Sequence, residues 1–132
     1  MEEHLPICIV EDSPPIRRLM EVLLTKAGFS VVSFSEVGEA QAWLEEHRPL
    51  AVVCDLMLPD GDGLDILRTV RIQPWGEHVP VVAVTGLAHE KDQEYYLQQG
   101  FDAYIIKPLS TLTFAAQIKE ILARKATPTG EG

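Results

Sequence analysis

The stretch Leu50–Asp55, LAVVCD, decides the fold, because five apolar residues follow one another and end in a carboxylate. A half-buried strand would alternate apolar and polar residues, whereas a strand covered by helices on both faces is apolar throughout. Leu5–Val10 and Val79–Val84 have the same near-continuous apolar character. We therefore predict three central strands of a parallel sheet.

Helical patterns lie between these strands. After the first strand, apolar residues recur at the spacing of one helix face, and Ser13, as the N-cap, and Pro14 mark the predicted start of the helix, with Gly28 at its end. Two further strands are predicted at Phe29–Phe34 and, shorter, at Ala103–Ile106. The four later helices are predicted over Glu36–His47, Leu64–Ile72, Ala88–Gln99 and Ser110–Arg124.

Five strand–helix units in 132 residues predict an α/β fold with a doubly wound, five-stranded parallel sheet. A closed barrel of eight such units needs about twice the chain. Residues 1–125 are expected to form one domain. The small and polar residues 126–132 are expected to be a flexible tail or a linker stump.

Charge and composition exclude several functions. Eleven basic and twenty acidic residues give a net charge of −9 without a basic stripe, which argues against nucleic-acid binding. No apolar run approaches the roughly 20 residues of a membrane-spanning helix, and the acidic N-terminus is unlike a signal peptide. Cys8 and Cys54 lie in apolar runs and are interpreted as buried, reduced thiols of a cytoplasmic protein.

Polar residues follow the strands where a parallel sheet binds its ligands, at the carboxyl ends. Glu11 and Asp12 follow the first strand, Asp55 the third, Thr85 the fourth and Lys107 the fifth. Three neighbouring carboxylates need a cation, and oxygen ligands with open positions suit Mg²⁺. The lysine and the hydroxyl can bind phosphoryl oxygens, and a carboxylate can be phosphorylated. This group of residues predicts phosphoryl transfer to an aspartate.

Four motifs resemble the receiver domain of two-component response regulators, over about residues 5–124. Ile9–Ser13 is similar to the acidic pair of that family, and Asp55–Gly63 to its phosphoacceptor loop. Val84–Gly86 is similar to its hydroxyl residue followed by a small one, although the usual alanine is glycine here. Gly100–Leu109 resembles its last strand with Lys-Pro. The order and spacing of the four motifs make the resemblance specific.

The resemblance implies a flavodoxin-like (βα)5 fold with strand order 2-1-3-4-5. It implies that Asp55 accepts a phosphoryl group from the phosphohistidine of a sensor histidine kinase or a histidine phosphotransfer protein. Thr85 and Lys107 would bind the phosphoryl oxygens. The implied Mg²⁺ ligands are Glu11, Asp12, Asp55 and the backbone carbonyl of Met57.

The resemblance also implies how a signal leaves the site. Tyr104 would change rotamer together with Thr85, and the bond between Lys107 and Pro108 would be cis. A downstream protein would bind a face made of the predicted fourth helix, fifth strand and fifth helix. The predicted fourth helix has a thin apolar stripe, which suits a mobile element.

Three hypotheses about function follow. The leading one is a phosphorylation-controlled switch that catalyses only its own phosphorylation and dephosphorylation. The second is a Mg²⁺-dependent phosphatase with an aspartyl nucleophile. Such enzymes need two aspartates two positions apart after the first strand, and this is disfavoured here because Asp12 is followed by Ser13 and Pro14. The third is a degenerate receiver that only binds, which the intact acidic set disfavours. The chain is either a single-domain regulator or the receiver of a longer protein, and Trp75 is either a partner contact or surface packing.

Overall fold

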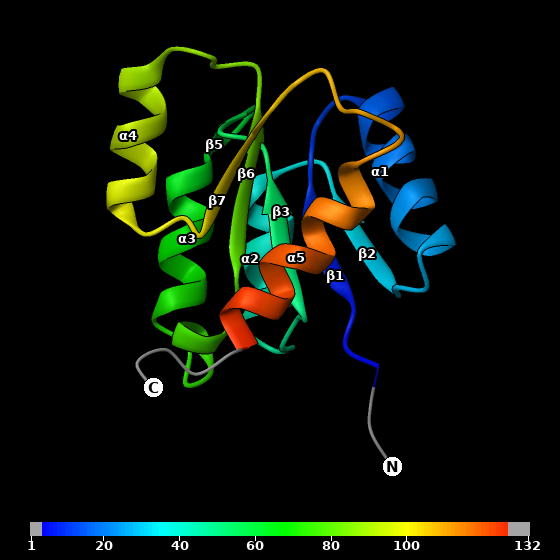
Figure 1. Cartoon of the computed structure of the whole chain (residues 1–132). Helices are drawn as coiled ribbons and strands as arrows, with labels where there is room; N and C mark the ends of the chain where they lie inside the picture. Colours follow the sequence, from blue (N-terminus) through cyan, green and yellow to red (C-terminus); the bar gives the residue numbers. More distant parts are fainter. Residues whose placement is uncertain (1–3, 127–132) are drawn as a thin grey trace, which may run out of the picture.

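Five parallel strands form the central sheet in the computed structural model, which describes residues 4–126 (Figure 1). The strand order is β2-β1-β3-β6-β7, and each neighbouring pair is parallel. This is the expected 2-1-3-4-5 order when only the strands of this sheet are counted. The bounds are β1 Ile7–Val10, β2 Val31–Phe34, β3 Ala51–Cys54, β6 Val81–Thr85 and β7 Ala103–Ile106.

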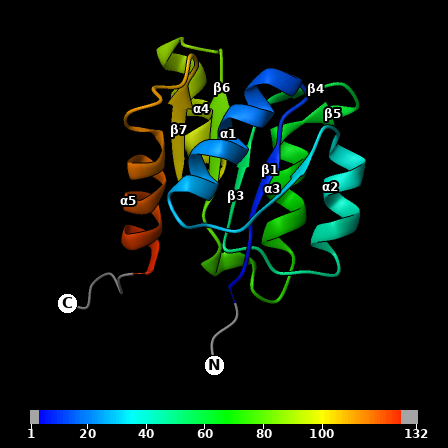
Figure 2. The same ribbon diagram turned by 90° about the vertical axis from the view of Figure 1, so that its right-hand side faces the viewer.

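Helices cover both faces of the sheet, as predicted. The helices α1 and α5 lie on one face, and α2, α3 and α4 lie on the other (Figures 1 and 2). The bounds are α1 Pro14–Lys26, α2 Val37–Leu44, α3 Gly63–Arg71, α4 Glu90–Gln99 and α5 Phe114–Ala126, with a short 3₁₀ helix, η1, at Gly76–His78. None of the helices between residues 4 and 126 has the length and apolar character needed to cross a bilayer.

The two-sided core explains the unbroken apolar runs. In β1, Ile7 and Ile9 pack toward α1 and α5, while Cys8 and Val10 pack toward α2 and α3. Every residue of β1 and β3 is buried. Both cysteines are free and buried, as predicted, and burial raises the pKa of Cys8 to about 12. A thiol with so high a pKa is a poor nucleophile at neutral pH.

The helix α4 is the least anchored of the five. None of its residues is buried, which agrees with its thin apolar stripe. Tyr96 is half-buried and meets Phe101 at a ring-centroid distance of 6.1 Å. The Nδ1 atom of His89 accepts a hydrogen bond from the backbone N–H of Lys91 and so caps the helix. A helix with few apolar anchors needs little free energy to move.

Some predicted details were wrong. Ser13 is the N-cap residue of α1, as predicted, although its side chain makes no capping hydrogen bond. The last helix begins at Phe114 instead of Ser110, because the carbonyl of Ser110 closes a turn with the N–H groups of Thr113 and Phe114. Since α5 continues through Ala126, that residue is not part of a tail. The rest of the predicted tail, residues 127–132, lies outside the described residues.

Two short elements were not predicted. Residues Met57–Leu58 (β4) and Gly61–Asp62 (β5) form a small antiparallel hairpin after β3. The 3₁₀ helix η1 follows α3, and Trp75 just before it is half-buried against the core on the α3 side of the sheet. The packing interpretation of Trp75 therefore holds for the isolated chain.

Candidate phosphoryl-acceptor site

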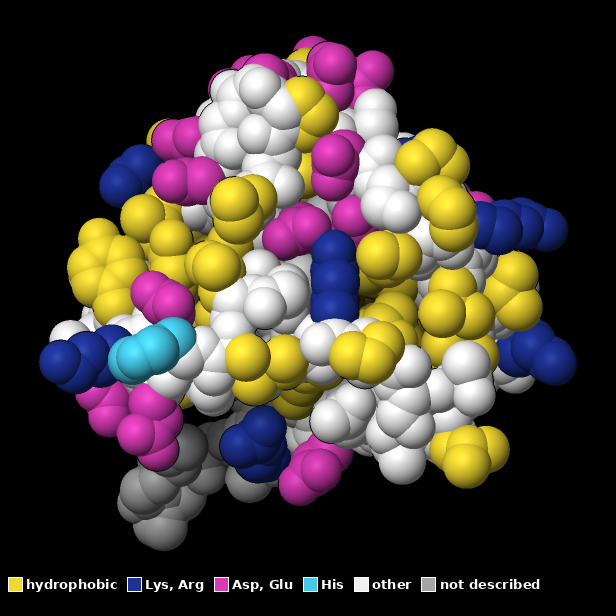
Figure 3. Space-filling view, turned by 90° about the horizontal axis from the view of Figure 1, so that it is seen from above, with side chains coloured by type: hydrophobic (Ala, Val, Ile, Leu, Met, Phe, Trp, Pro, Cys, Tyr) yellow, Lys and Arg dark blue, Asp and Glu magenta, His cyan; other side chains and the backbone are white. Residues whose placement is uncertain are grey.

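Three carboxylates meet at the carboxyl edge of the sheet, as predicted. Glu11 and Asp12 follow β1, and Asp55 follows β3, so the parallel pairing of these two strands places them side by side. One oxygen of each lies within 4.8 Å of the others. Figure 3 looks down on this edge and shows a basic side chain among acidic ones near the middle of the face.

The basic group of the cluster is Lys107, which follows β7. Its Nζ lies 2.7 Å from Oδ2 of Asp55 and 2.9 Å from Oε1 of Glu11. Burial by itself lowers the pKa of Lys107, but its contacts with the carboxylates of Asp55 and Glu11 outweigh this effect, and the pKa lies above its ordinary value. The lysine is therefore charged at neutral pH. The peptide bond between Lys107 and Pro108 is cis.

The Asp55 carboxylate is held at both oxygens. Oδ1 accepts hydrogen bonds from the backbone N–H groups of Leu56 at 2.7 Å and Met57 at 3.2 Å. Oδ2 accepts the hydrogen bond from Lys107. Only 7% of the residue is exposed, and the side chain of Met57 beside it is 65% exposed. The carboxylate is therefore oriented by its neighbours before any reaction begins.

Glu11 is fully buried at the base of the cluster. Its Oε2 accepts a hydrogen bond from the backbone N–H of Ser13 at 3.1 Å, which fixes one oxygen of the carboxylate. Its Oε1 makes no hydrogen bond of good geometry within residues 4–126, and only the ion pair with Lys107 compensates it. Burial raises the pKa of Glu11, whereas the lysine and the Ser13 N–H act against this rise.

This donor set fits Mg²⁺. Three carboxylates face one ammonium group, which leaves two negative charges if all are ionised. Mg²⁺ prefers carboxylate oxygens and keeps several waters. Asp12 is exposed, so water can reach this side of the cluster. The buried Oε1 of Glu11, which lacks a well-directed hydrogen bond, is the kind of atom that a cation compensates.

The side chains of Thr85 and Tyr104 both form hydrogen bonds with the backbone of Leu87. Thr85 ends β6 and is 1% exposed, and its Oγ1 accepts a hydrogen bond from the N–H of Leu87 at 3.3 Å. The Tyr104 hydroxyl, from β7, donates to the carbonyl of Leu87 at 2.7 Å. Burial raises the pKa of Tyr104, so this hydroxyl keeps its proton. A shift of the Thr85 hydroxyl would thus move the Leu87 backbone, and this movement would alter the hydrogen bond between Leu87 and Tyr104.

Asp60 has a role that the sequence reasoning missed. It lies between β4 and β5, and its carboxylate accepts hydrogen bonds from the N–H groups of Val37 at 2.7 Å and Gly38 at 3.0 Å. Asp60 therefore caps α2 from another part of the chain, while the N-cap residue Glu36 makes no such bond with its side chain. The only sequence signal was an acid in a turn, which does not reveal a partner 22 residues away.

Replacing Asp60 with Ala is expected to lower the thermal midpoint at neutral pH. The backbone hydrogen bonds from Gly38 and Val37 lower the pKa of Asp60, so it stabilises the fold above the ordinary pKa of aspartate. That contribution is lost as the pH falls through the lowered value. The midpoints of wild type and Asp60→Ala should therefore converge in acid. Glu46→Ala, another exposed acid, should match wild type at both pH values, and a constant difference for Asp60→Ala would contradict the capping role.

Gly63 allows the backbone that follows Asp55 to approach α3 closely. A Cβ atom at Gly63 would lie 2.9 Å from the carbonyl oxygen of Asp55 and 2.9 Å from a methyl group of Leu56. The N–H of Gly63 also donates to the carbonyl of Leu56 at 3.0 Å. A side chain here would push directly on the backbone that carries Asp55.

Gly63→Ala is expected to lower the free energy of unfolding by about 1–3 kcal/mol, the usual cost of overpacking. The matched control is Gly86→Ala, since a Cβ atom at Gly86 meets nothing within 4 Å and its φ is ordinary. That variant should be neutral or slightly stabilised. Urea denaturation of both variants measures the difference, and equal stability would contradict the close approach.

Comparison with known proteins identifies this arrangement. Residues 7–119 match the family model described as the response regulator receiver domain. The chain is 32% identical over 117 residues to an uncharacterised 14.6 kDa protein of Leptolyngbya boryana, with 89% of each protein covered. It is 38% identical over 119 residues to the transcriptional regulatory protein GltR of Pseudomonas aeruginosa. That match covers 89% of this chain but only 49% of the regulator.

Solved structures agree with the sequence comparison. A receiver domain protein of Methanospirillum hungatei superposes with a TM-score of 0.82 at 28% identity, covering 93% of this chain and 97% of that one. The receiver domain of a sensor histidine kinase from Pseudomonas aeruginosa, solved with a magnesium ion in its active-site cleft, gives a TM-score of 0.77 at 32% identity. That match covers 92% and 97% of the two chains. The chain belongs to the response regulator receiver domain family.

Proposed function

We propose that the chain is a signalling switch in which Asp55 accepts a phosphoryl group from a phosphohistidine. One observation carries the proposal: the Asp55 carboxylate is held between the Lys107 ammonium group and two further carboxylates. The donor would be a sensor histidine kinase or a histidine phosphotransfer protein. Family membership supports the signalling role, and the geometry supports the choice of Asp55.

The residues of the site have separable roles in this transfer. A carboxylate oxygen of Asp55 attacks phosphorus and forms the new P–O bond, while the P–N bond to the donor imidazole breaks and its electron pair returns to the ring. Lys107 and the Thr85 hydroxyl bind the phosphoryl oxygens as negative charge redistributes. Mg²⁺, held by Glu11, Asp12, Asp55 and the Met57 carbonyl, would supply neutralisation of that charge.

The same contacts suggest how phosphorylation reaches a partner. Because Thr85 and Tyr104 both bond to Leu87, movement of the Thr85 hydroxyl toward a phosphoryl group would shift the segment that leads into α4. No residue of α4 is buried, so the helix can follow. We propose that the face made of α4, β7 and α5 binds the downstream protein, and exposed apolar side chains such as Tyr95 and Ile106 lie on these elements.

The relatives differ in length, so the response that a whole protein would produce is a separate question from the switch proposed for this chain. This chain covers 49–52% of the phosphate-regulon and GltR transcriptional regulators but 89% of the Leptolyngbya protein. The proposed switch needs only the described residues, whether the module acts alone or within a longer protein.

Labelling with a small phosphodonor tests the proposed function. The chain is incubated with phosphoramidate and Mg²⁺, and its intact mass is followed over time. One phosphoryl adduct per chain is expected, with none when a chelator removes the metal. The phosphatase alternative predicts steady release of nitrophenol from p-nitrophenyl phosphate instead. Turnover of that substrate without a phosphoryl adduct would overturn the switch proposal.

Amide exchange tests the output face. Phosphodonor and Mg²⁺ are expected to change exchange in Glu90–Gln99 and Ala103–Ile106, because these segments adjoin the Leu87 link. Changes confined to α1 would place the output elsewhere. Tyr104→Phe, which removes the hydroxyl that bonds to Leu87, should reduce the change in α4 while leaving labelling of Asp55 intact.

A further inference from the structure

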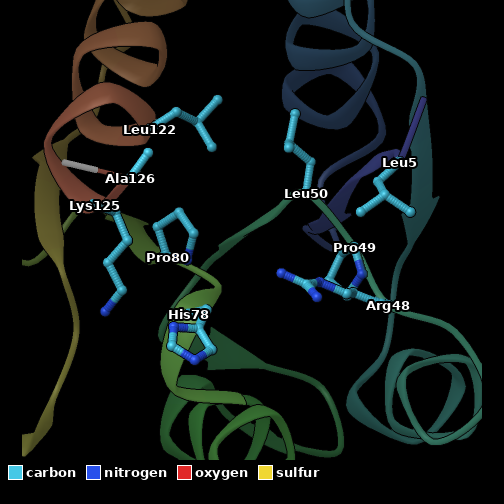
Figure 4. A pocket seen from close by; sticks show the side chains of 9 residues that line it. All are labelled: Leu5, Arg48, Pro49, Leu50, His78, Pro80, Leu122, Lys125 and Ala126. Carbon is cyan, nitrogen blue, oxygen red and sulfur yellow. The ribbon is translucent and has the colours of Figure 1, made fainter. Parts of the chain in front are cut away.

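A pocket lies at the edge of the sheet opposite to the edge that carries Asp55. We call it the basal pocket and define it by six of its residues, Arg48, Leu50, His78, Pro80, Leu122 and Lys125. It has a volume of about 450 Å³, within the range of small-molecule sites. Arg48 and Leu50 lie between α2 and β3, His78 ends η1, Pro80 directly precedes β6, and the other two lie on the last turns of α5. Figure 4 shows these side chains around the hollow.

The charge of the basal pocket is opposite to that of the protein. The chain carries a net charge of −9, yet the ionisable side chains that line this pocket are Arg48, His78 and Lys125, and no described carboxylate lines it. The Arg48 guanidinium and the His78 ring make no ion pair or hydrogen bond with any residue in the range 4–126. Among residues 4–126, these two nitrogen-bearing groups are therefore left without a polar partner.

Lys125 is held in position by the fold. Its Nζ lies 2.9 Å from Oδ1 of Asp102, and the other oxygen of Asp102 binds Arg71 at 3.0 Å. In Figure 4, Arg48 and Lys125 enter from opposite sides of the pocket and His78 from a third. The three nitrogen-bearing side chains thus surround the pocket instead of forming a single patch beside it.

The remaining walls are apolar. Leu50 and Leu122 lie on the side of the pocket away from His78, and Pro80 lies above His78 and beside Lys125 in the view of Figure 4. Proline has no backbone N–H to donate, so this wall offers hydrophobic contact instead of a hydrogen bond. An apolar lining with a few polar groups is the usual composition of a small-molecule site.

We propose that the basal pocket binds a small organic carboxylate with an aliphatic body. The carboxylate would accept hydrogen bonds from Arg48, supported by His78 and Lys125, and the aliphatic body would pack on Leu50, Leu122 and Pro80. This site is distinct from the phosphoryl-acceptor cluster and does not depend on the function proposed for that cluster.

Titration of the full chain with octanoate, followed by ¹⁵N–¹H correlation spectra, tests the proposal. Saturable shifts are expected near Arg48, His78 and Lys125. 1-Octanol, which lacks the charge, and acetate, which lacks the aliphatic body, are each expected to bind at least about tenfold more weakly, equivalent to about 1.4 kcal/mol. Equal affinity for octanoate and octanol, or for octanoate and acetate, would overturn the proposal.

Substitution of the free arginine locates the site. Arg48→Gln is expected to weaken octanoate binding about tenfold, because it removes the uncompensated charge. Arg124→Gln removes an exposed charge that does not line the basal pocket and should bind like wild type. Wild-type affinity of Arg48→Gln, or shifts confined to Glu11, Asp12 and Asp55, would refute this site. Asp55→Asn should still bind octanoate, so the octanoate experiment can succeed or fail independently of the phosphorylation proposal.

Discussion

Replacing Asp55 with Asn is expected to abolish the phosphoryl adduct completely. The amide keeps the shape of the side chain but is a very poor nucleophile and cannot form an acyl phosphate. Asp55 is 7% exposed, and its carboxylate is oriented by two backbone N–H groups and by Lys107, so we expect neither neighbouring carboxylate to take over the reaction. Intact-mass measurement after incubation with phosphoramidate and Mg²⁺ reads the result directly.

Asp60→Asn is the matched control for this experiment. Asp60 lies in the same loop and is also a carboxylate, but it bonds to the N-terminus of α2 instead of the acidic cluster. The variant keeps an oxygen that can accept a hydrogen bond, and it should be labelled like wild type. An adduct that persists in Asp55→Asn and disappears in Asp60→Asn would move the phosphorylation site to Asp60.

Replacing Arg71 with Ala is expected to lower the free energy of unfolding by about 2–3 kcal/mol. The Arg71 guanidinium donates to the carbonyls of Gly76, Val79 and Gly100 at 2.7–2.9 Å and to Asp102 at 3.0 Å. It joins the end of α3 to η1, to the start of β6 and to the end of α4. The side chain is 25% exposed, so water replaces these contacts only in part.

Two further variants identify the cause of this loss. Arg71→Lys keeps the charge but not the fork of donors, and should lose most of the same stability. Arg18→Ala breaks an ion pair with Glu21 whose arginine is 76% exposed, and should change stability by less than about 0.5 kcal/mol. Urea denaturation measures all three. Equal losses for Arg71→Ala and Arg18→Ala would mean that the Arg71 network adds no more than a surface ion pair.

Most of the candidate site was predictable because parallel strands bring their carboxyl ends to one edge. Glu11, Asp12, Asp55 and Lys107 each stand at or next to the end of an apolar run, and the local pattern was sufficient to bring these four together. Ser13 is the N-cap residue of α1, as predicted, but the residue pattern did not show that its side chain makes no capping hydrogen bond or that its backbone N–H donates to Glu11.

The sequence alone determined the number and order of the strand–helix units, the two-sided core and the chemical types at the sheet edge. These follow from the period of apolar residues and from local turn signals, which act over a few neighbouring positions. Only the tertiary structure decided that Asp60 caps α2, that Arg71 joins four segments and that Arg48, His78 and Lys125 surround one pocket. Those contacts join side chains to groups far away along the chain, and the packing of the whole fold sets their distances.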